Sequence, residues 1–159
     1  MRDGQLKGPL TGFTCATGSM YFHMAAMNGG NYASTQEFIT NQCSAGNYNG
    51  SVVFAYNVTI KETGGRGQRR SFDDIEVGDL CIQLSSSRTN NGDHHMCLVV
   101  WRDEDHLYTF DTNATKKVGI INRNQVETEE CMDFYDLPRM DTRKWVVASP
   151  EGLYRHFGK

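Results

Sequence analysis

The chain lacks a long apolar run, an excess of basic charge and closely spaced cysteines. No apolar stretch approaches the ~20 residues of a membrane-spanning helix, so we expect no membrane span. The formal net charge of -3 gives no electrostatic reason to expect nucleic acid as a partner. None of the five cysteines belongs to a Cys-x-x-Cys motif, which argues against a zinc ribbon, and we expect neither a metal nor a cofactor.

The N-terminal residues Met1–Gln5 are polar and lead into no apolar core of the kind that signal peptides have. We therefore expect a protein that stays in the cytosol or is exported by a secretion system that reads no signal peptide. A length of 159 residues suits one domain with one sizeable core, and no repeat or linker divides the chain. Residues 1–159 are predicted to be a single domain.

Helical signals come first along the chain, and strand signals follow them. Three methionines at helical spacing predict a helix from Cys15 to Asn28 with Thr14 as its N-cap, and Ser34 to Glu37 has the form of a capping box that begins a second, short helix. Apolar runs predict strands at 52–58, 80–84, 95–101, 107–110, 118–121 and 144–148. Cys81 and Cys97 lie within these apolar alternations and are expected to be buried. Helices followed by an antiparallel meander predict an α+β fold.

Cys15 lies at the start of the first predicted helix, one residue after its N-cap. The partial positive charge of a helix N-terminus stabilises a thiolate, which is the nucleophilic form of cysteine. The free backbone N–H groups of a first helical turn also stabilise the oxyanion of a tetrahedral intermediate. Cys15 is therefore the candidate nucleophile.

His95 begins the predicted strand 95–101. Strand alternation puts His95, Cys97 and Val99 on one face, while the preceding His94 has the opposite phase and faces the loop or solvent. Both faces of this strand are apolar, so we expect it to be central in its sheet and covered on both sides. Since a general base must be held by a rigid element, His95 is the candidate base. The next strand ends in Asp111, and a short hairpin brings that end beside His95, so Asp111 is the candidate that orients the imidazole, with Asn113 in reserve.

Three stretches resemble the papain-like amidase group, which includes the NlpC/P60 and CHAP hydrolases and the amidase effectors of type VI secretion. They are Thr14-Cys15-Ala16, the segment 73–80 that ends in Gly-Asp-Leu, and the segment 95–100 that begins with His95. The resemblance implies a papain-like (NlpC/P60-like) fold in which N-terminal helices pack on an antiparallel sheet. It also implies that Cys15 is the nucleophile, that His95 is the base, and that Asp111 is the polar group of the next strand.

The sequence thus predicts a cysteine hydrolase that cleaves an amide bond through a Cys15–His95–Asp111 triad without metal or cofactor. A peptidoglycan-peptide amidase or endopeptidase is favoured, in keeping with a secreted effector toxin whose partner is an immunity or inhibitor protein. A deamidase of protein Gln or Asn side chains and a cysteine protease, each with a peptide or protein substrate, are the alternatives within this class.

Two readings of other classes remain. Loops rich in Gly, Asn and Ser at 46–50 and 85–92 are typical of recognition surfaces, so a non-catalytic binding module is the first. The second is a metal site built from Asp93, His94 and His95. Adjacent strand residues point to opposite faces and chelate poorly, which makes this site the weakest of the readings.

Overall fold

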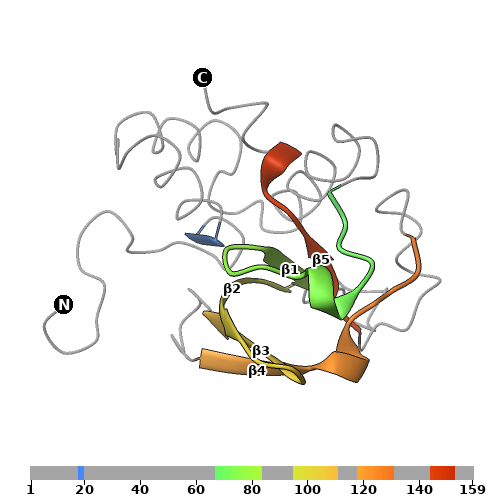
Figure 1. The fold of residues 1–159 in the computed structure, drawn as a ribbon. Coiled ribbons are helices and arrows are strands. Elements are labelled where there is room, and N and C mark those ends of the chain that lie inside the picture. The colour runs from blue at the N-terminus through green and yellow to red at the C-terminus, as the bar shows by residue number, and fades with distance from the viewer. Residues whose placement is uncertain (1–17, 20–66, 84–94, 111–117, 131–143, 153–159) are drawn as a thin grey trace, which may run out of the picture.

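The computed structural model describes residues 18–19, 67–83, 95–110, 118–130 and 144–152. Within these residues, five strands form one antiparallel sheet in the order β4-β3-β2-β1-β5, which Figure 1 shows as a strongly curved layer. The strands are β1 (Leu80–Gln83), β2 (His95–Arg102), β3 (His106–Phe110), β4 (Val118–Asn122) and β5 (Val146–Ala148). Two 3₁₀ turns, η1 (Phe72–Asp74) and η2 (Arg123–Gln125), precede β1 and follow β4.

The hydrophobic core lies against one face of the sheet and draws one side chain or more from each strand. Side chains of η1 and of the segment after η2 complete it. The members of this core cluster are each at most 4% exposed: Phe72, Ile75, Cys81, Cys97, Val99, Leu107, Ile121, Val126 and Val147. Burial of such apolar side chains supplies about 1.5–3 kcal/mol each, which is what holds the sheet in its curved form.

β2 occupies the middle of the sheet, between β1 and β3. Its first half is covered on both faces, since Met96, Cys97 and Val99 are buried, but Trp101 is 57% exposed. A β-bulge between Val99 and Trp101 shifts the alternation, so that Trp101 faces Tyr108 and Arg102 faces Leu107 in the β2–β3 register. The prediction of a strand covered on both faces is therefore right only for the first half of β2.

Arg102, at the end of β2, ties the sheet to η1. Its Nη1 donates hydrogen bonds to the carbonyl oxygens of Phe72 at 2.9 Å and Ile75 at 2.8 Å. The same guanidinium lies 5.0 Å from the centre of the Phe72 ring, and the guanidinium of Arg123 lies 4.3 Å from it. Because both cations lie over this buried ring, they help to close the core at η1.

The Gly-Asp-Leu sequence at 78–80 forms the turn that leads into β1. Gly78 has a φ of 100°, a left-handed conformation that favours glycine. The Asp79 N–H donates to the Glu76 carbonyl at 3.1 Å, and the buried Asp79 carboxylate accepts from the Glu76 N–H and from both Nε and Nη2 of Arg69. This stretch, which carried part of the family resemblance, therefore has a structural role in holding the turn.

The expected fold class is wrong for the part of the chain that the structure describes. That part is an antiparallel five-stranded sheet with two 3₁₀ turns, and no α-helix is among its elements. Helical backbone occurs there only at 18–19 and 151–152. An α+β, papain-like arrangement of N-terminal helices packed on a sheet is accordingly withdrawn. Of the predicted helix from Cys15 to Asn28, the structure describes Gly18 and Ser19, which have helical backbone and are buried, and the rest of that prediction lies outside the described residues.

The strand predictions after residue 79 are confirmed. The expected segments 80–84, 95–101, 107–110, 118–121 and 144–148 correspond to β1 through β5, with ends that differ by one or two residues. The predicted strand at 52–58 and the predicted helix at 34–37 lie outside the described residues. No helix among the described residues is long and apolar enough to cross a membrane.

Candidate functional site

His95 is the one predicted catalytic residue that the structure describes. It is the first residue of β2 and faces Gln83, the last residue of β1, in the antiparallel register. Its side chain is half-buried, and its ring meets the Trp145 ring edge-on, with centroids 6.0 Å apart and planes at 73°. The imidazole therefore projects from a central strand, lies next to the indole ring of Trp145, and retains access to solvent.

Trp145 is itself held in place by its neighbours. The backbone N–H of Trp145 donates to the Gln125 carbonyl at 2.7 Å, and the backbone carbonyl of Trp145 accepts from the Glu127 N–H at 2.8 Å. Its side chain packs against the core cluster. The backbone hydrogen bonds and the packing of Trp145 therefore fix the position of the aromatic ring that the His95 imidazole contacts edge-on.

The two cysteines nearest to His95 in the sheet are unsuited to be nucleophiles. Cys97 and Cys81 are directly opposite each other on β2 and β1, and both are buried. The pKa of the Cys81 thiol is raised well above its ordinary value, mainly by a hydrogen bond with the Cys97 thiol and then by burial. A thiol kept protonated and out of solvent is unreactive, so neither Cys81 nor Cys97 is a candidate nucleophile.

The other two members of the predicted triad, Cys15 and Asp111, lie outside the described residues, as do Asn113, Asp93 and His94. The structure therefore gives no geometry between these groups and His95. Near Cys15, the described residues are Gly18 and Ser19, which are buried and have helical backbone. Among the described residues, no group of three or more His, Cys, Asp or Glu side chains is arranged to hold a metal ion.

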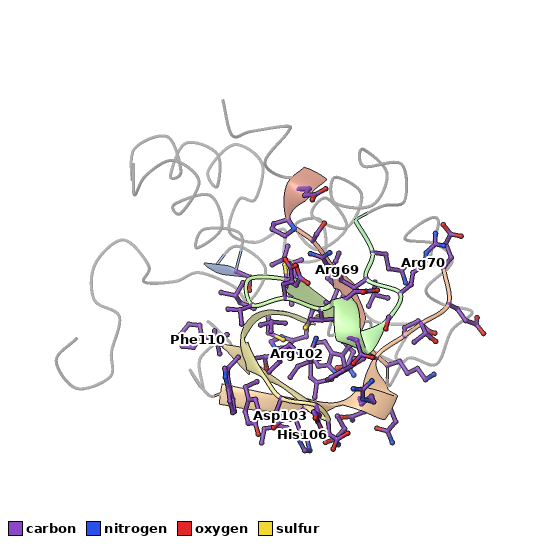
Figure 2. All side chains as sticks on the ribbon, viewed as in Figure 1. Arg69, Arg70, Arg102, Asp103, His106 and Phe110 are labelled. Atoms are coloured by element: carbon purple, nitrogen blue, oxygen red, sulfur yellow. The ribbon has the colours of Figure 1, made fainter. Side chains whose placement is uncertain are left out.

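A second polar cluster lies at the turn between β2 and β3, and the sequence analysis missed it. The Asp103 carboxylate accepts hydrogen bonds from the His106 N–H at 2.8 Å and from the Tyr108 hydroxyl at 3.0 Å, and its Oδ1 lies 3.1 Å from Nδ1 of His106. Hydrogen bonds, the largest from the Asp105 N–H, lower the pKa of the Asp103 carboxyl to about 2. Figure 2 shows Asp103 and His106 together at this turn.

The geometry of this second cluster is that of an Asx turn. An Asp followed by backbone N–H groups two and three positions later commonly accepts from both, and Asp103 does so with Asp105 and His106. The spacing of Asp103 and His106 in the charged turn could have indicated the cluster from the sequence. Its carboxylate is fully occupied in holding the turn, so it is a weak candidate for catalysis.

An exposed apolar row crosses the face of the sheet that lies opposite to the core. Trp101, Tyr108 and Ile120 face one another on β2, β3 and β4, and the rings of Trp101 and Tyr108 have centroids 4.9 Å apart. Trp101 is 57% exposed and Ile120 is 60% exposed. Phe110, labelled in Figure 2, lies on the same face at the far end of β3 from His106. Aromatic side chains exposed in this way are typical of binding surfaces.

Comparisons with protein-family models, with curated proteins and with solved structures find no match for this chain.

Proposed function

We propose that the chain is a cysteine hydrolase that cleaves an amide bond, with Cys15 as nucleophile, His95 as general base and Asp111 as the residue that orients His95. The observation that carries the proposal is the position of His95: the first residue of a central strand, half-buried, and in edge contact with the Trp145 ring. The burial of Cys81 and Cys97 supports it further, because it leaves the nucleophile to the cysteines elsewhere in the chain.

The proposed reaction has two steps. In the first, the Cys15 sulfur attacks the amide carbonyl carbon while His95 takes the thiol proton, and His95 then returns that proton to the departing amine. In the second, water attacks the resulting thioester, with His95 taking a proton from the water and returning it to the Cys15 sulfur as it leaves. Backbone N–H groups at Cys15 stabilise the oxyanion in both steps.

A peptidoglycan peptide is the favoured substrate, and a protein Gln or Asn side chain or a protein backbone amide is the alternative. One experiment separates them: mass spectrometry of purified peptidoglycan and of candidate target proteins after incubation with the chain. New muropeptides identify the first substrate, a one-dalton mass increase on a protein identifies a deamidase, and new peptide termini identify a protease. Cys15→Ala and His95→Ala should each reduce the rate at least about 10³-fold.

The matched control for His95→Ala is His106→Ala, which removes an imidazole at the opposite end of β2 and β3 from His95. Cys43→Ala is the corresponding control for Cys15→Ala. The controls should keep wild-type rates. Full activity in Cys15→Ala or His95→Ala, or equal loss in a variant and its control, contradicts the proposed mechanism. Asp111→Ala and Asn113→Ala, compared side by side, identify which of the two orients His95.

A non-catalytic binding module is the second candidate, and the exposed Trp101–Tyr108–Ile120 row favours it. If binding is the only function, Trp101→Ala abolishes association with peptidoglycan in a sedimentation assay, while Cys15→Ala binds as the wild type does and no product forms with either protein. Product formation by the wild type excludes this second reading as the whole function.

A further inference from the structure

Cys81 and Cys97 form a facing pair of thiols at the centre of the sheet. The β1–β2 register sets them directly opposite each other, and residues so placed project from the same face. Both side chains belong to the core cluster, with Cys81 at 0% and Cys97 at 2% exposure, and neither forms a disulfide. Neither has a role in the proposed reaction.

The backbone geometry at this pair suits a disulfide. The Val99 N–H donates to the Asp79 carbonyl at 2.9 Å, so residues 79 and 99 form a hydrogen-bonded pair, and the pair two positions along, Cys81 and Cys97, is of the same type. Such pairs have Cα atoms about 5.5 Å apart. A disulfide requires Cα atoms about 4.4–6.8 Å apart, which this spacing meets. It also requires Cβ atoms about 3.5–4.5 Å apart, and opposed Cβ atoms of a hydrogen-bonded pair are about 5.5 Å apart, so closure of the bond draws the two strands together by roughly 1 Å.

The two sulfur atoms also interact directly. Hydrogen bonding between the two thiols, together with their burial, raises the pKa of the Cys81 thiol. The same burial denies an oxidant access to the folded chain. Because β1 is paired on both sides, with β2 and with β5, opening of this pair is slow, and oxidation is expected during folding rather than afterwards.

We infer that Cys81 and Cys97 are a redox-active dithiol that closes to an intrachain disulfide when the chain folds in the presence of a small-molecule disulfide such as oxidised glutathione. One cysteine thiolate attacks the small disulfide, releases one glutathione thiolate and forms a mixed disulfide. The second cysteine thiolate attacks the protein sulfur and releases the second glutathione. The two cysteines lose two electrons and two protons in total, and oxidised glutathione becomes two reduced glutathiones.

Closure of this bond links two neighbouring strands next to His95, since Cys97 lies two residues further along β2 on the same face. It also closes a loop of about 17 residues, which restricts the unfolded chain. From loop-closure entropy and the usual response of domains of this size, the melting temperature should rise by about 6–12 °C. The inference is independent of the proposed hydrolase function, because it requires no catalytic step.

The test refolds the full chain from the reduced, unfolded state in a glutathione redox buffer and, in parallel, with excess reductant. Remaining thiols are alkylated with iodoacetamide in denaturant, and the products are digested and analysed by mass spectrometry. We expect a linked peptide that joins Cys81 to Cys97 and two fewer alkylated cysteines than in the reduced sample. The melting temperature should be higher than that of the reduced sample and should fall back once the linked chain is unfolded and refolded with excess reductant.

Two variants serve as matched controls. The double variant carries both Cys81→Val and Cys97→Val, which keep the core apolar. The triple variant replaces Cys15, Cys43 and Cys131 with Ala and leaves the proposed pair intact. The triple variant should still form the bond, and the double variant should form no intrachain bond that raises the melting temperature. Alkylation of both Cys81 and Cys97 after oxidative refolding overturns the inference. So does a bond from either cysteine to a different partner, or a linked chain that melts below the reduced one.

Discussion

Replacement of Asp79 tests how the turn before β1 is held. The carboxylate accepts from Nε and Nη2 of Arg69 at 2.9 and 3.2 Å and from the Glu76 N–H at 2.9 Å, and the side chain of Asp79 is only 2% exposed. Asp79→Ala removes all three bonds and leaves the Arg69 guanidinium without this partner. The side chain of Arg69 is 23% exposed, so water relieves part of that loss.

Removal of one partner from a buried ion pair costs about 3–5 kcal/mol. The partial exposure of Arg69 puts Asp79→Ala at the lower end, about 3 kcal/mol less stable than the wild type. Asp79→Asn keeps an oxygen that can accept from the Glu76 N–H, so its cost should be about 2 kcal/mol. Arg69→Met with Asp79→Leu removes the pair as a whole and should cost less than Asp79→Ala, because no charge is then left unpaired.

Urea unfolding, followed by tryptophan fluorescence and by circular dichroism, measures these free energies. Asp74→Ala is the matched control, since Asp74 is an exposed carboxylate in the neighbouring turn η1 and its loss should change stability by no more than about 0.5 kcal/mol. A cost below about 1 kcal/mol for Asp79→Ala, or a cost equal to that of Asp74→Ala, refutes the assignment of a structural role to the Arg69–Asp79 pair.

Three further predictions concern Gly78, Gly119 and the Asp103 carboxylate. Gly78→Ala should cost about 1–2 kcal/mol in urea unfolding, because the φ of 100° is unfavourable for a residue with a Cβ, and Gly78→Asn should cost less. Gly119→Ala should lower the free energy of unfolding by about 1–3 kcal/mol, because the new Cβ would lie 2.8 Å from Oγ1 of Thr109. Adding Thr109→Ala to the same chain should recover most of this free energy. If the double variant is as unstable as Gly119→Ala, the clash is not the cause. The Asp103 pKa of about 2 lies below the value of ~3.9 expected in the unfolded chain. The ionised Asp103 carboxylate therefore stabilises the fold above pH ~4, and this stabilisation disappears as the pH falls towards 2. Unfolding curves of the wild type and of Asp103→Asn should differ at pH 5 and above and converge as the pH is lowered to about 2.

Much of the sheet was predictable from the sequence because its strands carry strong local signals. β3 alternates half-buried and buried positions, and β1 and β5 are short apolar runs whose successive residues are buried on both faces. The charged turn after β2 was also predicted, since four charged residues between two apolar runs favour a hairpin. The burial of Cys81 and Cys97 followed from the same alternation and is confirmed.

The features that sequence reasoning missed depend on contacts between distant residues. The bulge after Val99 lies within a continuous apolar run, where no residue indicates a change of register. The role of Asp79 depends on Arg69, ten positions earlier, and the role of Arg102 depends on carbonyl oxygens of η1, nearly thirty positions away. The edge contact between His95 and Trp145 joins two residues fifty positions apart in sequence.

The candidate site was predictable only in part. The alternation of β2 correctly put His95 at the start of a central strand, because that conclusion needs local pattern alone. Whether Cys15 and Asp111 meet it depends on the path of segments outside the described residues, and it stays a prediction.

Residue-resolved alkylation tests the proposed Cys15–His95 pair most directly. The rate at which iodoacetamide modifies each of the five cysteines is measured by mass spectrometry between pH 5 and pH 9, for the wild type and for His95→Ala, with His106→Ala as the control. If His95 and Cys15 form an ion pair, Cys15 reacts fastest, remains reactive below pH 7, and in His95→Ala acquires the profile of an ordinary thiol with a pKa near ~8.5. An ordinary Cys15 profile in the wild type, unchanged by His95→Ala, contradicts the proposed function.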